Sequence, residues 1–119
     1  MYASAGSTSP LEELRARTSA VATAVVSSNG AVLAARLPEG VYADTLSIMC
    51  ATAVGALETA SRELGLPGVE RIVLEGPDSF GLLVRISPSA ILVVILPPGG
   101  DRARAEDEVK GFVARWGPS

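Results

Sequence analysis

The chain has 119 residues, a length that suits one domain, and its 48% apolar and 19% charged residues are typical of a globular protein. Its formal net charge is −3 and its ten lysines and arginines are scattered among acidic residues, which argues against a nucleic-acid-binding face. It has one cysteine, Cys50, and no histidine, so an internal disulfide is excluded and the commonest general base and metal ligand is absent.

The N-terminal segment, residues 1–9, is mostly small and polar, and we expect it to form a flexible tail ahead of a single domain over residues 10–119. It has neither the basic nor the apolar region of a signal peptide. The longest unbroken apolar run, residues 90–96, is far shorter than the roughly 20 residues of a membrane-spanning helix. We therefore expect a cytoplasmic protein that does not insert into a membrane.

The first helix is predicted over about residues 10–18. Ser9 is expected to be its N-cap, and Pro10 suits the first helical position. Glu12 stands where a capping-box carboxylate bonds back to the cap residue.

A β-hairpin follows, with strands over residues 21–28 and 31–36. Asn29-Gly30 stands between them, and this dipeptide favours a two-residue turn in which both residues have positive φ. Residues 37–40, Leu-Pro-Glu-Gly, then end the pattern.

A long helix is predicted over residues 41–64, with Gly65 as its C-terminal cap. One apolar stripe steps along it by four and three residues: Leu46, Cys50, Ala53, Leu57, Ala60 and Leu64. Glu58 is the only charged residue from Thr45 through Ser61, and apolar residues also occupy the other faces. One uncovered stripe on a helix about 36 Å long would expose on the order of 350 Å², as much as the largest patch of a typical monomer. A second face of this helix must therefore be covered by the domain or by another chain.

Three strands are predicted in close succession, over residues 70–76, 80–86 and 90–96, with turn clusters between them. The first should have one buried and one wetter face, because Ile72 and Leu74 alternate with charged neighbours. The last is apolar on both faces and is therefore expected at the centre of the sheet.

A final helix is predicted from an Asp101 cap to about Trp116. The element order is then α-β-β-α-β-β-β-α, an α+β fold of the α/β-sandwich type. Five strands joined mainly by hairpins form an antiparallel sheet, with the long helix on one face and the two terminal helices on the other.

No residue is assigned to catalysis, to a cofactor or to a metal. Cys50 lies inside the apolar helix without a basic neighbour in sequence to form a thiolate, and is expected to be a core residue. Ser27 and Ser28 lack the G-x-S-x-G setting of a nucleophile elbow. Residues 76–81 space two glycines like a phosphate-binding loop, but two leucines follow where lysine and serine or threonine are needed.

Charged side chains could still contact a partner protein. Arg62, Arg71 and Arg85 could meet an acidic partner, although a solvated surface is the simpler interpretation of each. The helix N-terminus after Gly99-Gly100 could bind an anion, but the carboxylate of Asp101 is expected to occupy it.

Five segments together carry a resemblance to a known family. They are the strand, Asn-Gly turn and strand at residues 24–34, the low-charge helix at residues 46–64, and the last three strands at residues 72–75, 80–86 and 90–96. They resemble the roadblock family of dynein-light-chain-like proteins and bacterial and archaeal small-GTPase regulators. The resemblance covers about residues 10–116.

The resemblance implies a homodimer in which the third strands, here residues 70–75, pair edge to edge and the long helices lie side by side. The interface that it implies consists of Leu46, Met49, Cys50, Ala53, Val54, Leu57, Arg71, Val73 and Glu75. It also implies that a small Ras-like GTPase docks on the paired helices, or that the dimer is a scaffold in a larger complex. No catalytic residue and no cofactor is carried over.

The expected function is a dimeric, non-enzymatic regulator or scaffold that prefers one nucleotide state of a small GTPase and so shifts its population. The alternative is a small-molecule sensor or a general protein-interaction module of longin- or profilin-like fold. Strand positions such as Leu82, Val84 and Ile86 offer no convergent polar groups for a ligand. A hydrolase or transferase is disfavoured by the absent histidine and nucleophile motif.

Overall fold

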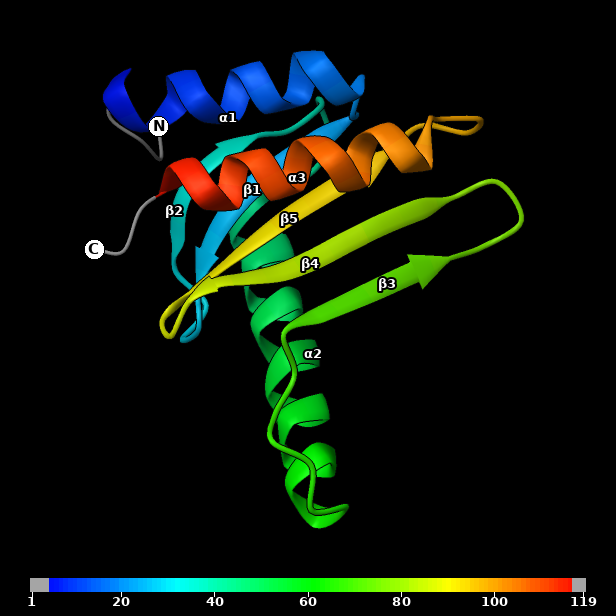
Figure 1. Ribbon diagram of the computed structural model, residues 1–119. Helices are drawn as coiled ribbons and strands as arrows, with labels where there is room; N and C mark the ends of the chain where they lie inside the picture. Colours follow the sequence, from blue (N-terminus) through cyan, green and yellow to red (C-terminus); the bar gives the residue numbers. More distant parts are fainter. Residues whose placement is uncertain (1–4, 117–119) are drawn as a thin grey trace.

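The computed structural model describes residues 5–116, which form three helices and five strands in the predicted order (Figure 1). The elements are α1 (Ala5–Thr18), β1 (Ala22–Ser27), β2 (Val32–Arg36), α2 (Ala43–Glu63), β3 (Arg71–Glu75), β4 (Phe80–Ser87), β5 (Ala90–Leu96) and α3 (Arg102–Trp116). The strands form one antiparallel sheet in the order β2-β1-β5-β4-β3. The predicted α+β sandwich is confirmed.

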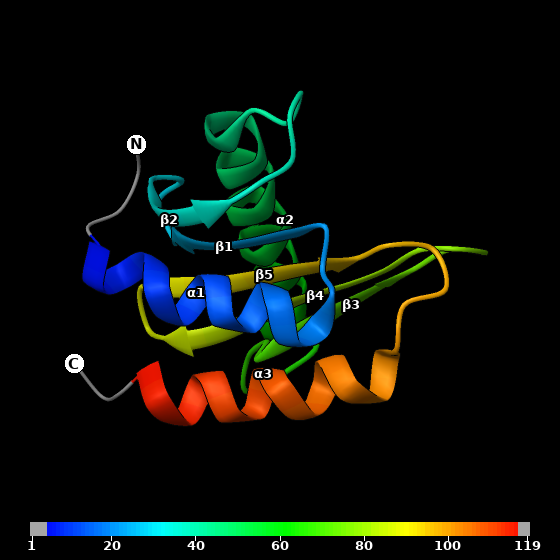
Figure 2. The same cartoon turned by 90° about the horizontal axis from the view of Figure 1, so that it is seen from above.

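β5 lies at the centre of the sheet, as its apolar faces predicted, and alternate residues enter two separate cores. Leu92 and Val94 pack with residues of α1 and α3, whereas Ile91 and Val93 pack under α2. Figure 2 shows α1 and α3 side by side on one face of the sheet and α2 on the other. Burying each of these side chains stabilises the fold by about 1.5–3 kcal/mol, so both layers of helices are held to the sheet.

The hairpin between β1 and β2 has a three-residue loop instead of the predicted two-residue turn. The Gly30 N–H donates to the Ser27 carbonyl (3.0 Å), and the Ser27 N–H donates to the Ala31 carbonyl (2.8 Å). Gly30 has a φ of 95° but Asn29 has no positive φ, so the prediction for Asn29 is wrong. The pairing of β1 with β2 shifts register after Val25. A type I turn followed by a glycine bulge produces this combination.

α1 begins earlier than predicted, at Ala5, so Pro10 lies inside the helix. The predicted Ser9 cap and the Glu12 capping box are therefore wrong. Proline predicts a helix boundary because it has no N–H to donate to the carbonyl four residues earlier. Two fully buried leucines in the next turn hold this helix on the sheet, and their burial offsets the lost hydrogen bond. The start of the predicted tail, residues 1–4, lies outside the described residues.

The ends of α2 and α3 are capped as predicted. At the end of α2, the Leu66 N–H donates to the Ser61 carbonyl (2.9 Å) and the Gly65 N–H donates to the Arg62 carbonyl (3.0 Å). Gly65 has a φ of 74°, and this pair of bonds is the Schellman motif. At the start of α3, Asp101 Oδ1 accepts a hydrogen bond from a backbone N–H in the first turn (3.0 Å).

Candidate interaction surface on α2 and β3

The side of α2 that packs on the sheet differs from the predicted stripe. Five residues of α2 are buried, and only Cys50 among them belongs to the predicted stripe. They are Ala43, Ser47, Cys50, Val54 and Ser61. Three of these residues carry a hydroxyl or a thiol, so hydropathy alone indicated the neighbouring side. Ser47 is tolerated there because its Oγ donates to the Gly30 carbonyl in the β1–β2 hairpin (2.5 Å).

The apolar side of α2 beside this buried face remains exposed. Met49, Leu57 and Leu64 are 60%, 44% and 74% exposed, and Ala53 and Ala60 between them are exposed too. These five residues recur at steps of four and three, so they line one side of the helix. We call them the α2 stripe. A surface helix normally turns its apolar stripe to the core, and an exposed stripe of this length marks an interaction site.

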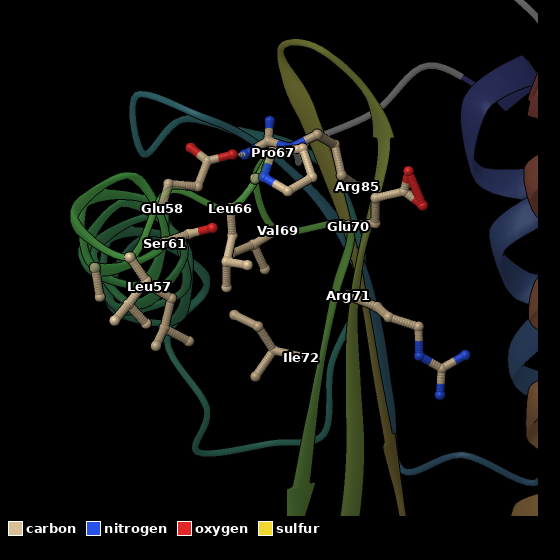
Figure 3. A pocket seen from close by; sticks show the side chains of 13 residues that line it. Leu57, Glu58, Ser61, Leu66, Pro67, Val69, Glu70, Arg71, Ile72 and Arg85 are labelled. Carbon is tan, nitrogen blue, oxygen red and sulfur yellow. Dashed lines mark hydrogen bonds and ion pairs between the residues drawn. The ribbon is translucent and has the colours of Figure 1, made fainter.

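A groove of about 830 Å³ separates the second half of α2 from the beginning of β3 (Figure 3). At one end, Ile72 points from β3 toward α2, where Leu57 lies. At the other end, Glu58 and Arg85 bridge the two elements. Leu66 and other apolar side chains form most of its wall, so the groove continues the apolar surface of the α2 stripe.

Two of the four charged residues that line the groove, Glu58 and Arg85, bond each other. Arg85 Nη2 donates to Glu58 Oε2 (2.5 Å), and Arg85 Nη1 donates to the carbonyl of Pro88 (3.0 Å). Both charged side chains are partly buried. Because Glu58 is the only charge of this part of α2 and is used inside the chain, the α2 stripe stays uncharged.

β3 forms one edge of the sheet, and its outer side pairs with no other strand among residues 5–116. Residues of an antiparallel pair alternate between those that exchange hydrogen bonds and those that do not. The Arg85 N–H donates to the Glu70 carbonyl (2.8 Å), so the peptide groups of the even-numbered residues of β3 are the ones that bond to β4. The peptide groups of Arg71, Val73 and Glu75 therefore point away from the sheet.

The far end of β3 is more exposed than predicted. Val73 is 42% exposed and Leu74 is 49% exposed, although Leu74 was expected on a buried face. Only Ile72 is partly buried. α2 passes the beginning of β3 and leaves its far end uncovered (Figure 1), so Val73 and Leu74 remain accessible to another chain.

Two ion pairs tie the odd-numbered side chains of β3 to α3. Arg71 Nη1 lies 2.7 Å from Glu106 Oε1, and Glu75 pairs with Arg102. The hydrogen bond from Arg71 lowers the pKa of the Glu106 carboxyl. These side chains therefore lie on the α3 face of the sheet, and the even-numbered ones lie on the α2 face.

The opposite edge of the sheet, β2, is protected. Its pairing with β1 contains a bulge, and α1 packs beside it. Arg36 at its end lies 3.5 Å from Glu12 of α1. Bulges, charges and covering helices are the ways in which proteins block edge strands. β3 has no register shift and no proline, so it is the edge that remains open to pairing.

The structure divides the nine predicted interface residues into three groups. The α2 stripe contains Met49, Ala53 and Leu57, and the outer edge of β3 contains Arg71, Val73 and Glu75. The remaining three are partly or fully buried against the sheet: Leu46, Cys50 and Val54. These three contact the chain's own core, so they offer a second chain little surface.

The cysteine, serines and glycine loop that were considered for chemistry lie in the core or in turns. Burial raises the pKa of the Cys50 thiol. Ser27 and Ser28 hydrogen bond within neighbouring turns. Residues 76–81 include the tight turn of the β3–β4 hairpin. Within residues 5–116, no three acidic, histidine or cysteine side chains are grouped to hold a metal ion, and no helix is long and apolar enough to cross a membrane.

The groove was missed by sequence reasoning, although one signal pointed to it. Arg85 is the only charged residue between Asp78 and Asp101, just as Glu58 is alone in its part of the helix. Two isolated and opposite charges in apolar segments that pack together are expected to meet, because an unpaired buried charge is costly. That pairing would have placed β4 beneath the second half of α2.

The sequence matches the family described as the Roadblock/LC7 domain over residues 10–96. Two uncharacterised proteins of Methanocaldococcus jannaschii are 39% and 35% identical to it over 71 residues. Each match covers 60% of this chain, and 59% and 61% of the relatives. The chain therefore spans about three fifths of the length of these curated relatives.

Several solved structures share the fold. Myxococcus xanthus MglB has a TM-score of 0.88 at 15% identity, covering 94% of this chain and 92% of that one. A structure described as MglB with a tetrameric arrangement has a TM-score of 0.84 at 20% identity, covering 92% and 84%. A Roadblock/LC7 domain from Streptomyces avermitilis has a TM-score of 0.80 at 17% identity, covering 89% and 90%. With residues 10–96 matched by the family and the fold shared throughout, the chain belongs to the Roadblock/LC7 domain family.

Proposed function

We propose that this protein is a homodimeric, non-enzymatic interaction module that binds a small Ras-like GTPase and acts as its regulator or scaffold. The observation that carries the proposal is the exposed, uncharged α2 stripe beside the open edge of β3. The roadblock resemblance implies an interface on these same two elements. Membership of the Roadblock/LC7 family supports the proposal at the level of the domain.

The homodimer accounts for surface that one chain leaves uncovered. The outer peptide groups of β3 need hydrogen-bond partners, and a second β3 supplies them when two edges join. Burial of Met49, Leu57 and Leu64 against a second α2 would remove the exposed stripe from water. The similar structure described as having a tetrameric arrangement supports association of copies in this fold.

The GTPase would meet the outer side of α2, which faces away from the sheet and from the α2 stripe. Ile48 is exposed there together with Thr52, Gly55 and Thr59. A Cβ placed on Gly55 would have no atom within 4 Å, so a partner can approach the helix closely at this point. Regulation would follow from tighter binding to one nucleotide state, because a ligand shifts an equilibrium only by its difference in affinity.

Titration of a small Ras-like GTPase from the same organism, loaded with GDP or with a non-hydrolysable GTP analogue, tests this proposal. A regulator is expected to prefer one state by about 100-fold, which corresponds to about 2.7 kcal/mol. Ile48→Asp should weaken binding at least about 10-fold, because it introduces a charge into an uncharged interface. Lys110→Ala on α3, on the opposite face of the sheet, is the control and should bind normally. Equal affinity for both states would leave a scaffold, and no binding in either state would contradict the proposal.

The groove between α2 and β3 favours one alternative, a small-molecule sensor, since its volume is in the range of ligand pockets. Against this alternative, three of its four charged groups are already paired within the chain, Glu58 with Arg85 and Arg71 with Glu106. A thermal-shift screen of small metabolites distinguishes the two functions. Stabilisation by a ligand that Ile72→Asp abolishes would favour the sensor, and a flat screen would favour the protein-binding module.

A further inference from the structure

Within the proposed homodimer, we infer that the two-fold axis of the antiparallel β3 pair lies at Val73, so that Arg71 of each copy faces Glu75 of the other. This inference rests on the proposed homodimer and adds its register, which is a property of these particular residues. The partner is a second copy of the same chain, and the surface is the outer edge of β3.

The hydrogen-bonding pattern restricts the register. Two edges can join only if outward-pointing residues lie opposite each other, and in β3 these are Arg71, Val73 and Glu75. An axis at Val73 places all three opposite an outward residue of the partner strand. A shift of the axis by one residue toward the N-terminus, to Ile72, would place Glu75 opposite Val69, which lies outside the strand. A shift the other way would place Arg71 opposite Pro77, which has no N–H to donate.

The charges favour the same register. With the axis at Val73, each Arg71 lies opposite a Glu75, and opposite charges at directly paired positions of a sheet attract. Within each copy Arg71 already bonds Glu106, and Glu75 already bonds Arg102. The four charged groups then alternate in sign across the junction on the α3 face. In either shifted register, Val73 would lie opposite a charged residue instead.

The other face of the junction is apolar in this register. Ile72 of each copy lies opposite Leu74 of the other, on the face that carries α2. Leu74 is exposed in the single chain, and the neighbouring strand would cover it. The apolar pair also continues the floor of the groove, where Ile72 faces Leu57. One register therefore matches charge with charge on one face and apolar side chains with each other on the second.

Disulfide trapping tests the register. The two Val73 Cα atoms would be about 5.5 Å apart, within the range that a disulfide spans. Val73→Cys, oxidised with glutathione disulfide, is therefore expected to form a covalent dimer. The two Leu74 Cα atoms would be about 8 Å apart, so Leu74→Cys should remain uncrosslinked. The native Cys50 is buried, and the unsubstituted chain serves as the background.

Light scattering on the same samples separates failure of the register from failure of the homodimer. A dimeric mass with crosslinking at Leu74→Cys and none at Val73→Cys would overturn the register and leave the proposed dimer standing. A monomeric mass of the unsubstituted chain would overturn the dimer itself and the register with it.

Charge reversal in separate chains gives a second test that does not depend on thiols. Arg71→Glu places like charges opposite each other in its homodimer, and so does Glu75→Arg, so each alone should dimerise at least about 10-fold more weakly. In an equimolar mixture, the first chain is acidic at both positions and the second is basic at both. The mixed dimer should therefore form more tightly than either homodimer. Each variant has lost the same ion pair to α3 whether it forms a homodimer or the mixed dimer. A mixed dimer with no higher affinity than the two homodimers would therefore overturn the inference.

Discussion

Glu58 of α2 and Arg85 of β4 form a partly buried ion pair at 2.5 Å, and it is the contact that ties the second half of α2 to the sheet at one end of the groove. Arg85 also donates to the Pro88 carbonyl, so its guanidinium is held by α2 and by the turn between β4 and β5. The pair neutralises the single charge of this stretch of α2. It thereby leaves an uncharged helix surface for another chain.

Replacing Arg85 should destabilise the protein. Arg85→Met removes a charge-assisted hydrogen bond and leaves Glu58 partly buried without its partner, which costs about 1–2 kcal/mol. The free energy of unfolding in urea measures this loss. Arg62→Met is the control, because Arg62 is exposed and bonds only within its own helix, and it should change stability by less than about 0.5 kcal/mol. Equal effects of the two substitutions would contradict the role given to the Glu58–Arg85 pair.

Two buried serines of α2 should differ in their response to alanine. Ser47 Oγ donates to the Gly30 carbonyl, so Ser47→Ala leaves that acceptor unpaired and should cost about 1–3 kcal/mol. Ser61 Oγ is buried and has no hydrogen-bond partner among residues 5–116, so Ser61→Ala should be neutral or should stabilise by up to about 1 kcal/mol. Urea unfolding of the two variants at one protein concentration compares them directly. A larger loss at Ser61 than at Ser47 would refute this account of the helix.

The ion pair between Arg71 and Glu106 predicts a pH dependence. Arg71 lowers the pKa of Glu106, so the folded state holds the charged carboxylate more firmly than the unfolded state does. The resulting stability is present above the ordinary carboxyl pKa and is lost as the pH falls through the lowered value. In a plot of the urea midpoint of unfolding against pH, Glu106→Gln should therefore reduce the slope between about pH 7 and about pH 3. Glu39→Gln, at an exposed position, is the control and should leave the slope as steep as in the parent chain, whereas identical slopes in all three proteins would argue against the pair.

Cys50 should react slowly with thiol reagents. It is buried under α2, and burial raises the pKa of its thiol, which lowers the fraction of reactive thiolate. Ellman's reagent should label it in the native protein far more slowly than in urea. Lys110→Cys adds an exposed thiol on α3 as an internal standard, and labelling of Cys50 as fast as this standard would contradict its place in the core.

Much of the fold could be predicted from patterns within single segments. The apolar residues on both faces of β5 predict its place at the sheet centre. Gly65 predicts the end of α2, because glycine readily adopts the left-handed conformation found there. The prediction was wrong where contacts between segments distant in sequence determine the extent or the orientation of a helix. Pro10 lies inside α1 because the core holds that helix, and Ser47 faces the sheet because Gly30 accepts its hydrogen bond. The groove was missed because it forms only when α2 and β3 are brought together.

The central claim is that a second copy covers β3 and α2, and the solution mass of the chain with and without Val73→Pro tests it most directly. The N–H of Val73 points outward, so proline there blocks pairing with a second chain and leaves the hydrogen bonds of β3 to β4 in place. Light scattering at micromolar concentration should give the mass of two chains for the unsubstituted protein and of one chain for the folded variant. A monomeric unsubstituted protein, or a variant that remains fully dimeric, would contradict the account.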